Sequence, residues 1–328
     1  MLVLRRPETL ELSDLLVPCI EAVREAFVAY GSGRSLGMAR LHVGGLEGGV
    51  FHLTVGGIRD ETGGGTVGLK LNGRFPPTAG GHGQRVTGAI LLSDATTGAP
   101  VALMDSMVVT GLRTAAVTTV VVEALARPGS LRALLVGAGR QGRGQVDALV
   151  ATGRVAHLTV ADLIPEQAEM VAAYAAQHGL EAAVATDPRA AVAETDVVVT
   201  ITPSRGPLFG AGDISEGVVV VALGVDGPGK QELDPRLLAR SLVVVDNLEQ
   251  AAASGELQHA LAAGVMTREQ VYAELADLLA GTVAGRTSAK QTFVFDGTGT
   301  ALQDIAAASL LAAEARRRGI GLEIALDG

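Results

Sequence analysis

The sequence predicts an α/β fold with a doubly wound parallel sheet and a second, smaller α+β domain. From residue 131 onward, short apolar runs typical of buried parallel strands alternate with helical segments. Residues 41–101 instead contain strand-like runs separated by Gly and Pro clusters. One more helix, at residues 302–318, follows after the alternation ends. These three observations divide the chain into two domains, and both ends of the chain belong to the smaller one.

The N-terminal part predicts a helix followed by strands. Residues 13–30 carry apolar side chains at helical spacing and end at a glycine. Three strand-like runs follow, at residues 49–55, 66–71 and 89–94. The Gly-rich segment 56–65 is expected to form a loop. Residues 105–126 then predict one long helix, which Pro128 and Gly129 end.

The second domain is predicted from its alternating elements. Strands are expected at residues 133–136, 156–161, 182–185, 196–202, 218–223 and 242–245, with helices at 165–178 and 188–193 among them. The closing helix is expected to return to the first domain. The predicted boundaries are therefore residues 1–117 with 303–328 for the smaller domain, and residues 118–302 for the doubly wound domain.

A glycine motif lies between the first strand of the second domain and the helix after it. Gly137, Gly139 and Gly142 match the pattern G-x-G-x-x-G, in which a dinucleotide pyrophosphate meets free N–H groups at a helix N-terminus. The next strand ends in Asp162, a residue type that accepts hydrogen bonds from the adenosine ribose. No Arg or Lys follows in residues 163–165, so NAD(H) is favoured over NADP(H).

Further cofactor-binding residues are expected near this motif. In open parallel sheets, ligands bind beyond the carboxyl ends of the strands. The loops after the strands at residues 196–202 and 218–223 therefore join the predicted site. The candidates in the glycine loop and in these two loops are Arg140, Gln141, Thr200, Thr202, Ser204 and Val225.

Composition limits the classes of partner. The net charge of −9 and the pI near 5.2 argue against nucleic acid or an anionic membrane as a partner. The single cysteine, Cys19, cannot form an internal disulfide and has no metal-ligating neighbour, so a buried thiol and no metal site are expected. The N-terminus lacks the apolar core of a signal peptide, and no uninterrupted apolar run reaches transmembrane length. A cytoplasmic protein is expected.

Four charged residues lie among apolar or small neighbours: Arg40, Lys70, Arg113 and Asp226. Each of them alone fits a solvated or ion-paired side chain. Together they suggest a site in which cations hold a substrate carboxylate while one acid/base serves a reacting nitrogen.

Several motifs resemble the ornithine cyclodeaminase/μ-crystallin family over nearly the whole chain. They are Val-Gly-Leu-Lys at residues 67–70, Leu-Arg-Thr-Ala-Ala at 112–116, Gly-Val-Asp-Gly-Pro-Gly-Lys-Gln-Glu-Leu at 224–233, and Phe-Asp-Gly-Thr-Gly at 295–299 followed by Leu-Gln-Asp at 302–304. The resemblance implies an NAD(P)-dependent homodimer with a Rossmann domain and a substrate-binding, dimerisation domain. It also implies chemistry on amino acids through an imine.

The resemblance also implies residue roles. Lys70 and Arg113 resemble the residues that hold the substrate α-carboxylate, and Lys70 also resembles a residue close to the reacting atoms. Arg40 resembles a further carboxylate-binding arginine, in a less specific stretch. Asp226 resembles the family's acid/base.

His52 departs from the family pattern, because the ornithine enzymes have a glutamate there that holds the distal amine. An imidazole is a poor partner for an ammonium group. We therefore expect a substrate whose side chain is small, apolar or anionic, with His52 in the substrate site. The alternative is a structural histidine on a strand, whose hydrogen bonds are satisfied within the protein.

The sequence thus predicts an NAD-dependent oxidoreductase that interconverts an L-amino acid with its imino or keto acid. Two alternatives stay open. The first is a redox-neutral amino-acid cyclodeaminase, which shows no net change in NADH. The second is a binding protein for NAD(P)H and small ligands that has no activity. The joint presence of Lys70, Arg113 and Asp226 argues against the second alternative.

Overall fold

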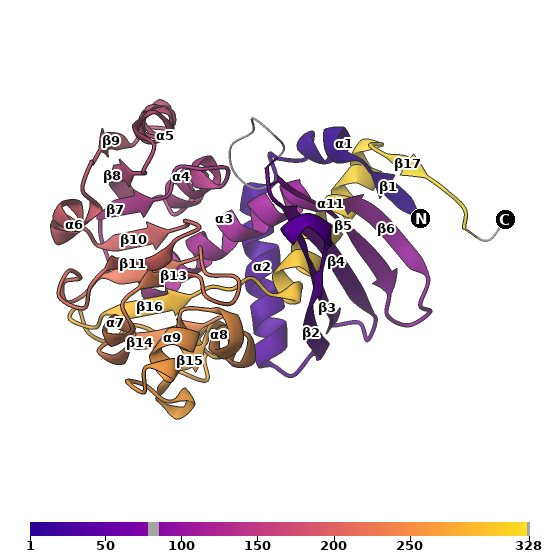
Figure 1. Ribbon diagram of the computed structural model, residues 1–328. Helices are drawn as coiled ribbons and strands as arrows, with labels where there is room; N and C mark the ends of the chain where they lie inside the picture. The colour runs from indigo at the N-terminus through magenta and orange to yellow at the C-terminus, as the bar shows by residue number, and fades with distance from the viewer. Residues whose placement is uncertain (78–84, 327–328) are drawn as a thin grey trace. The chain divides into compact units, whose positions relative to one another are not determined.

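A computed structural model describes residues 1–77 and 85–326 (Figure 1). The chain divides into two compact units. The first contains Met1–Ala116 and Thr300–Gly328, and the second contains Val117–Gly299. The closing helix therefore does return to the unit that the N-terminal part of the chain builds. The predicted boundaries, after residue 117 and before residue 303, lie within a few residues of these.

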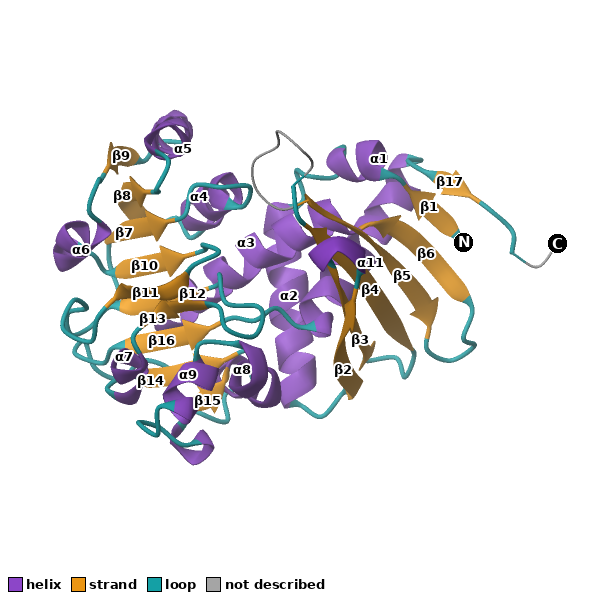
Figure 2. Ribbon diagram, in the orientation of Figure 1, coloured by secondary structure: helices purple, strands orange, loops and turns teal. Residues whose placement is uncertain are grey.

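The first unit is built on a mixed sheet of seven strands, in the order β17-β1-β6-β5-β4-β3-β2 (Figure 2). The strands are β1 (Leu2–Leu4), β2 (Ser35–Gly44), β3 (Val50–Arg59), β4 (Gly65–Phe75), β5 (Arg85–Asp94), β6 (Pro100–Asp105) and β17 (Leu322–Glu323). β2 to β6 form an antiparallel meander, and β1 pairs in parallel with β6. Antiparallel neighbours need only short connections, as between β2 and β3, between β3 and β4, and between β5 and β6.

Helices cover one face of this sheet. α11 (Ala301–Arg318) packs on β3, β4 and β5 and against α2 (Leu16–Gly31). Its buried face is mostly alanine and leucine, which allows close packing on the strands. A short helix, α1 (Arg6–Leu10), precedes α2, and the 3₁₀ turn η1 (Leu46–Gly48) joins β2 to β3. α3 (Ser106–Leu125) starts in the first unit and ends in the second.

The prediction of a loop over residues 56–65 was wrong at both ends, because β3 extends to Arg59 and β4 begins at Gly65. Residues 56–59 belong to β3, and the turn to β4 is closed by Asp60, whose carboxylate accepts the N–H groups of Thr62 and Gly64. A Cβ atom on Gly56 would lie 2.9 Å from Cβ of Ala301 in α11. Gly56 allows a helix to approach the strand closely. From the sequence alone, a glycine needed for close packing cannot be distinguished from a glycine in a flexible loop.

The second unit contains an eight-stranded sheet in the order β15-β14-β16-β12-β10-β7-β8-β9. Its strands are β7 (Leu131–Val136), β8 (Val155–Ala161), β9 (Glu181–Val184), β10 (Val197–Thr200), β12 (Val219–Ala222), β14 (Leu242–Val245), β15 (Ala273–Glu274) and β16 (Phe293–Asp296). Every pairing in this sheet is parallel. The predicted doubly wound parallel sheet is therefore confirmed, with β15 and β16 as additions.

The remaining elements of the second unit connect these strands. They are α4 (Gly142–Ala151), α5 (Pro165–Gln177), α6 (Pro188–Ala191), η2 (Val192–Glu194), β11 (Arg205–Phe209), β13 (Gln231–Leu233), α7 (Pro235–Ala239), α8 (Leu248–Ser254), α9 (Leu257–Ala262), η3 (Arg268–Gln270) and α10 (Leu275–Leu279). β11 and β13 form a separate parallel pair. The buried core is rich in Val and Leu, as expected for a sheet covered on both faces.

One helix among the described residues, α3, is long and apolar enough to pass a length-and-composition test for a membrane span. However, 67% of its most apolar window is buried within the protein. The interior side chains include Val120, Val121 and Val122, each with 0% exposure. The same test is passed by core helices of soluble proteins, so this helix is weak evidence for a membrane span.

Candidate functional site

The glycine motif forms the turn between β7 and α4. Gly137 has a φ of 110°, and a Cβ atom there would lie 2.7 Å from the carbonyl oxygen of Ile201. A Cβ on Gly139 would meet no protein atom within 4 Å, so its backbone is open to a close approach by a ligand. α4 starts after Gln141, whose side chain does not cap the helix. This helix N-terminus suits a pyrophosphate.

Asp162 follows β8 beside this turn. Its Oδ2 accepts the N–H of Ala138 at 2.6 Å, and its Oδ1 accepts the N–H of Ile164 at 2.8 Å. The carboxylate is therefore fixed against the glycine loop by two backbone donors. This position fits a group that receives ribose hydroxyls, so the residues present fit a bound dinucleotide. Arg140, in the same loop, is exposed.

The candidates after β10 and β12 have different environments. Thr200 is buried, and its hydroxyl donates to Oε2 of Glu232 at 2.7 Å. The Thr202 hydroxyl accepts the N–H of Ser204 at 3.2 Å, which shapes the loop after β10. Val225 is buried after β12, 1% exposed. The Thr200 hydroxyl thus points into the protein, toward a carboxylate that the sequence interpretation had not included.

Asp226 lies in the loop after β12. Its Oδ1 lies 2.5 Å from Nζ of Lys230, which also donates to the carbonyl oxygen of Gly224 at 3.0 Å. The Asp226 side chain is 32% exposed and that of Lys230 is 15% exposed. The carboxylate is therefore accessible and ion-paired, properties that suit a group that exchanges protons with a substrate.

Two of the predicted cations meet in the first unit. Lys70 Nζ lies 2.5 Å from Oδ2 of Asp304, and Arg113 Nε lies 3.2 Å from Oδ1 of the same residue. The hydroxyl of Thr54 is 3.4 Å from Asp304 Oδ2, and Nη1 of Arg113 is 3.3 Å from Oε1 of Gln303. Lys70 comes from β4, Arg113 from α3 and Asp304 from the first turn of α11. Three elements therefore form one buried charged cluster.

Arg40 and His52 lie on the same face of the sheet as this cluster. Arg40 on β2 is paired with Thr54 on β3, which is paired with Lys70 on β4. Directly paired residues share a face, and side chains two residues apart on a strand share it as well. His52 is two residues from Thr54, and its ring contacts that of His42 at 4.6 Å between centroids in an edge-to-face arrangement. Both predicted residues are thus on the helix-covered side.

Burial changes the acidity of the lysine in the cluster. Loss of solvent lowers the pKa of Lys70 from 10.5 to about 8, while the carboxylate of Asp304 raises it and Arg113 lowers it further. The Lys70 side chain is 8% exposed and that of Asp304 is 3% exposed. A lysine in this environment can gain or lose a proton near physiological pH.

Sequence reasoning had assigned no role to Asp304, Lys230 or Glu232. All three lie within the motifs that carried the family resemblance. The motifs alone did not indicate which groups these side chains contact. An acidic residue in the first turn of a helix is common, because it interacts favourably with the helix dipole. Asp304 therefore gave no signal of a buried ion pair.

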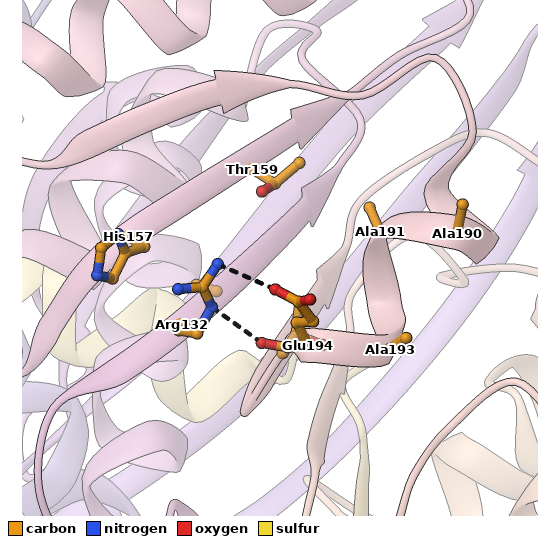
Figure 3. Close-up of a pocket in the computed structure, with 9 residues that line it drawn as sticks. Arg132, His157, Thr159, Ala190, Ala191, Ala193 and Glu194 are labelled. Atoms are coloured by element: carbon orange, nitrogen blue, oxygen red, sulfur yellow. Dashed lines mark hydrogen bonds and ion pairs between the residues drawn. The ribbon is translucent and has the colours of Figure 1, made fainter.

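A pocket of about 220 Å³ lies elsewhere in the second unit, between β7, β8, α6 and η2 (Figure 3). Arg132 in this pocket donates to the carbonyl oxygen and the carboxylate of Glu194. His157 is 2.9 Å from the carboxylate of Glu181. None of the predicted site residues lines it. Within residues 1–77 and 85–326, no group of three or more His, Cys, Asp or Glu side chains could hold a metal ion.

The second unit, with its parallel sheet and glycine loop, has the features of a dinucleotide-binding α/β fold. The first unit carries a cationic site made of Lys70, Arg113 and Asp304. The chain belongs to the ornithine cyclodeaminase/mu-crystallin family, which matches residues 2–318. The resemblance noted in the sequence is therefore confirmed.

Named relatives agree with the predicted enzyme class. An alanine dehydrogenase from Archaeoglobus fulgidus is 33% identical over 309 residues, which are 93% of this chain and 92% of the relative. The structure of Thermococcus litoralis Δ1-pyrroline-2-carboxylate reductase with NADH and L-proline has a TM-score of 0.91 at 28% identity, covering 99% of this chain and 100% of the other. An archaeal alanine dehydrogenase dimer with bound NAD has a TM-score of 0.91 at 31% identity, covering 99% of each chain. These relatives are oxidoreductases of amino acids and imines.

Proposed function

We propose that this protein is an NAD-dependent oxidoreductase that interconverts an L-amino acid with its imino or keto acid. The observation that carries the proposal is the buried cluster in which Lys70 and Arg113 converge on Asp304. A cluster with two cations and one carboxylate retains a positive charge, and a substrate α-carboxylate would neutralise it. Arg40, on the same sheet face, adds a further cation for this purpose.

The α-carboxylate of the substrate would receive hydrogen bonds from Lys70 and Arg113. Arg113 is suited to a planar carboxylate because its guanidinium donates in a fork. Lys70 presents a point charge and a proton whose pKa is near 8. Fixing the carboxylate at two points orients the α-carbon, which is the main contribution that binding residues make to such a reaction. His52 and its neighbour His42 would face the substrate side chain.

Asp226 is proposed as the acid/base. In the direction of amine oxidation it would take a proton from the substrate ammonium or from water, and in the reverse direction it would return one. Lys230 pairs with the Asp226 carboxylate at 2.5 Å and so holds the proposed acid/base in place. A bound nicotinamide dinucleotide supplies or accepts the hydride at the α-carbon.

NAD(H) is proposed over NADP(H) because of Asp162. Its carboxylate is held at the end of β8 by two backbone N–H groups and cannot easily turn away. A fixed negative charge at this place would accept hydrogen bonds from the ribose hydroxyls and repel a 2′-phosphate. The cofactor candidates in the glycine loop and after β10 and β12 remain part of this proposal.

A homodimer is proposed through the uncovered face of the first sheet. Side chains that alternate with Arg40, Thr54 and Lys70 point away from α11, and several of them are apolar and exposed. They are Leu41 at 58%, Val43 at 44%, Val55 at 36%, Leu69 at 37% and Leu71 at 41%. An apolar sheet face of this kind is typical of a protein interface. The archaeal alanine dehydrogenase described as a dimer supports a second copy as the occupant.

The function is tested by following NADH absorbance in the presence of ammonia and a panel of 2-oxo acids that includes pyruvate, glyoxylate and oxaloacetate, with preformed cyclic imines added to the panel. Reduction of an imine consumes one NADH and one proton and gives one amino acid. Net NADH oxidation with one member of the panel is the expected result, and that member identifies the side-chain class.

The outcomes separate the alternatives. Deamination of a diamino acid with no net change in NADH would contradict the proposal and support a cyclodeaminase. Tight NADH binding with no turnover on any compound would support a binding protein. Conversion of ornithine to proline with ordinary efficiency would also contradict the expectation drawn from His52.

A further inference from the structure

Glu232 is a fully buried carboxylate that joins two strand ends of the second unit. It lies on β13 and has an exposure of 0%. Its Oε2 accepts the hydroxyl of Thr200 at 2.7 Å and the N–H of Gly224 at 3.0 Å. Its Oε1 accepts the N–H of Thr202 at 2.6 Å. The two amides can only donate, so the carboxylate acts as an acceptor for both strand ends at once.

The two segments that Glu232 joins belong to neighbouring strands. Thr200 is the last residue of β10 and Gly224 follows β12, and these strands pair in parallel. A Cβ atom on Gly224 would lie 2.3 Å from the carbonyl oxygen of Thr202 and 2.5 Å from the Glu232 side chain. The segments therefore lie in close contact, with no space for a side chain at position 224.

The position of Glu232 is itself fixed by a second buried carboxylate. Oε1 of Glu256 accepts the N–H of Glu232 at 2.7 Å, and its Oε2 accepts the N–H of Leu233 at 3.2 Å. Glu256 is 1% exposed and lies directly before α9. The β13 backbone thus cannot shift without breaking these two hydrogen bonds, and this fixes the backbone that carries the Glu232 carboxylate.

The segments that Glu232 joins carry the proposed functional groups. Thr202 and Ser204 follow β10, and Asp226 is two residues after Gly224. We propose that Glu232 is a positioning residue, which fixes the cofactor-binding loop after β10 and the acid/base loop after β12 relative to each other. This inference rests on the proposed function, because it needs those two loops to act in one reaction.

The test uses Glu232→Gln, which keeps the size of the side chain but leaves one acceptor oxygen. Either the amide of Thr202 or that of Gly224 then faces an NH₂ group. Loss of such a buried bond is expected to weaken NADH binding about tenfold and to accelerate hydrogen exchange of residues 200–204 and 224–230 by a similar factor. NADH fluorescence and exchange measured by mass spectrometry give the two readouts.

Substitutions at Thr200 give a second, milder test, which stays usable if Glu232→Gln does not fold. Thr200→Val removes one donor and leaves both amide bonds, so a smaller effect of the same kind is expected. Thr200→Ser keeps the hydroxyl that donates to Glu232, so its effects on NADH binding and on exchange are expected to be smaller than those of Thr200→Val. The order of effects follows the number of bonds lost at the Glu232 carboxylate.

A matched control exists on the same strand segment. Asp196 lies before β10, at the opposite end from Thr200, and its Oδ2 accepts the N–H of Arg132 at 2.9 Å. Asp196→Asn is expected to lower the Tm without changing NADH affinity or exchange at residues 200–204. A purely structural role of Glu232 would give this same pattern.

Unchanged NADH affinity and unchanged exchange in Glu232→Gln would overturn the inference. A failure of the unaltered protein to bind NAD(H) would overturn the proposed function instead. In that event the exchange rates of residues 200–204 and 224–230 still decide whether Glu232 joins the two loops.

Discussion

Lys70 and Asp304 form a buried ion pair at 2.5 Å between a strand near the start of the chain and the helix near its end. The pair has a second cation, Arg113, on the other carboxylate oxygen. Buried pairs of this kind give little net stability, because both charges lose their hydration. With two cations on one carboxylate, this cluster carries a positive charge that suits the binding of an anionic group.

The first prediction concerns the pH dependence of substrate affinity. Lys70 loses its proton near pH 8, because burial lowers its pKa from 10.5. The neutral lysine no longer attracts a carboxylate, so KM is expected to rise as the pH increases through about 8. Lys70→Arg keeps its charge at this pH and is the control, in which KM should stay flat over the same range. A pH-independent KM in the unaltered protein would exclude Lys70 from carboxylate binding.

The second prediction concerns Asp226. Asp226→Asn removes the proton acceptor with almost no change in shape, so turnover should fall about a hundredfold or more while NADH affinity is retained. Asp234→Asn is a suitable control, since this nearby carboxylate caps α7 by accepting the N–H of Arg236 at 2.8 Å. Steady-state kinetics and NADH fluorescence measure the two effects. Wild-type turnover in Asp226→Asn would remove Asp226 from the mechanism.

The third prediction concerns cofactor choice. Asp162→Arg places a cation where the carboxylate now lies, and preference should shift from NADH toward NADPH. Asp162→Asn removes only the charge and still offers an oxygen to one of the two backbone donors, so it should narrow the preference without reversing it. The ratio of kcat/KM for the two cofactors is the measurement. An unchanged ratio in both variants would show that Asp162 does not contact the ribose.

The fourth prediction concerns stability. Burial raises the pKa of Asp296 from 3.8 to about 7, so the folded protein binds a proton there that the unfolded chain releases. This contribution favours folding at acidic pH and is lost as the pH rises from about 4 to 7. Asp296→Asn mimics the protonated acid and keeps an acceptor for the N–H of Leu257. Its Tm should exceed that of the unaltered protein at pH 8 by more than at pH 5.

An equal Tm difference between Asp296→Asn and the unaltered protein at pH 5 and at pH 8 would contradict this linkage. Such a result would mean that Asp296 is already ionised in the folded protein at pH 5. Thermal unfolding at the two pH values, with both proteins in the same buffers, measures the difference directly.

The fifth prediction concerns assembly. The double substitution Leu41→Lys and Leu71→Lys would place two charges on the apolar sheet face. The dimer should then dissociate into monomers. Leu163→Lys is the control, because Leu163 is an equally apolar and fully exposed residue of the second unit. Sedimentation velocity gives the oligomeric state. A monomeric unaltered protein, or a dimer that survives the double substitution, would exclude this face as the interface.

The parallel sheet and the longer helices could be predicted because their patterns are local. Runs such as Val197–Thr200 and Val219–Ala222 are apolar and β-branched, and a segment that contains several Gly and Pro residues separates them. The short strands were harder. β15 has two residues and β1 has three, so neither contains enough alternation to produce a pattern.

The candidate site could be predicted where a charge stood out against apolar neighbours, as with Lys70 and Arg113. The residues that complete it could not. Asp304 lies in the first turn of a helix, where an acid is ordinary, and its partners depend on the return of α11 to the first unit. Thr200 was predicted as a cofactor-binding residue, but the hydrogen bond that its hydroxyl donates to Glu232 could not be predicted. That pairing depends on register between strands, which residue types alone do not specify.

The discontinuous first unit also has a consequence for the order of synthesis. Residues 117–299 form a continuous unit, and all of them are synthesised before α11. The first unit is begun earlier but lacks the carboxylate of Asp304 until residue 304 has been added. Until then Lys70 and Arg113 have no counter-ion from α11, and β3 and β4 lack the helix that covers them. The growing chain therefore contains every residue of its second unit before it contains the carboxylate that completes the charged cluster of the first.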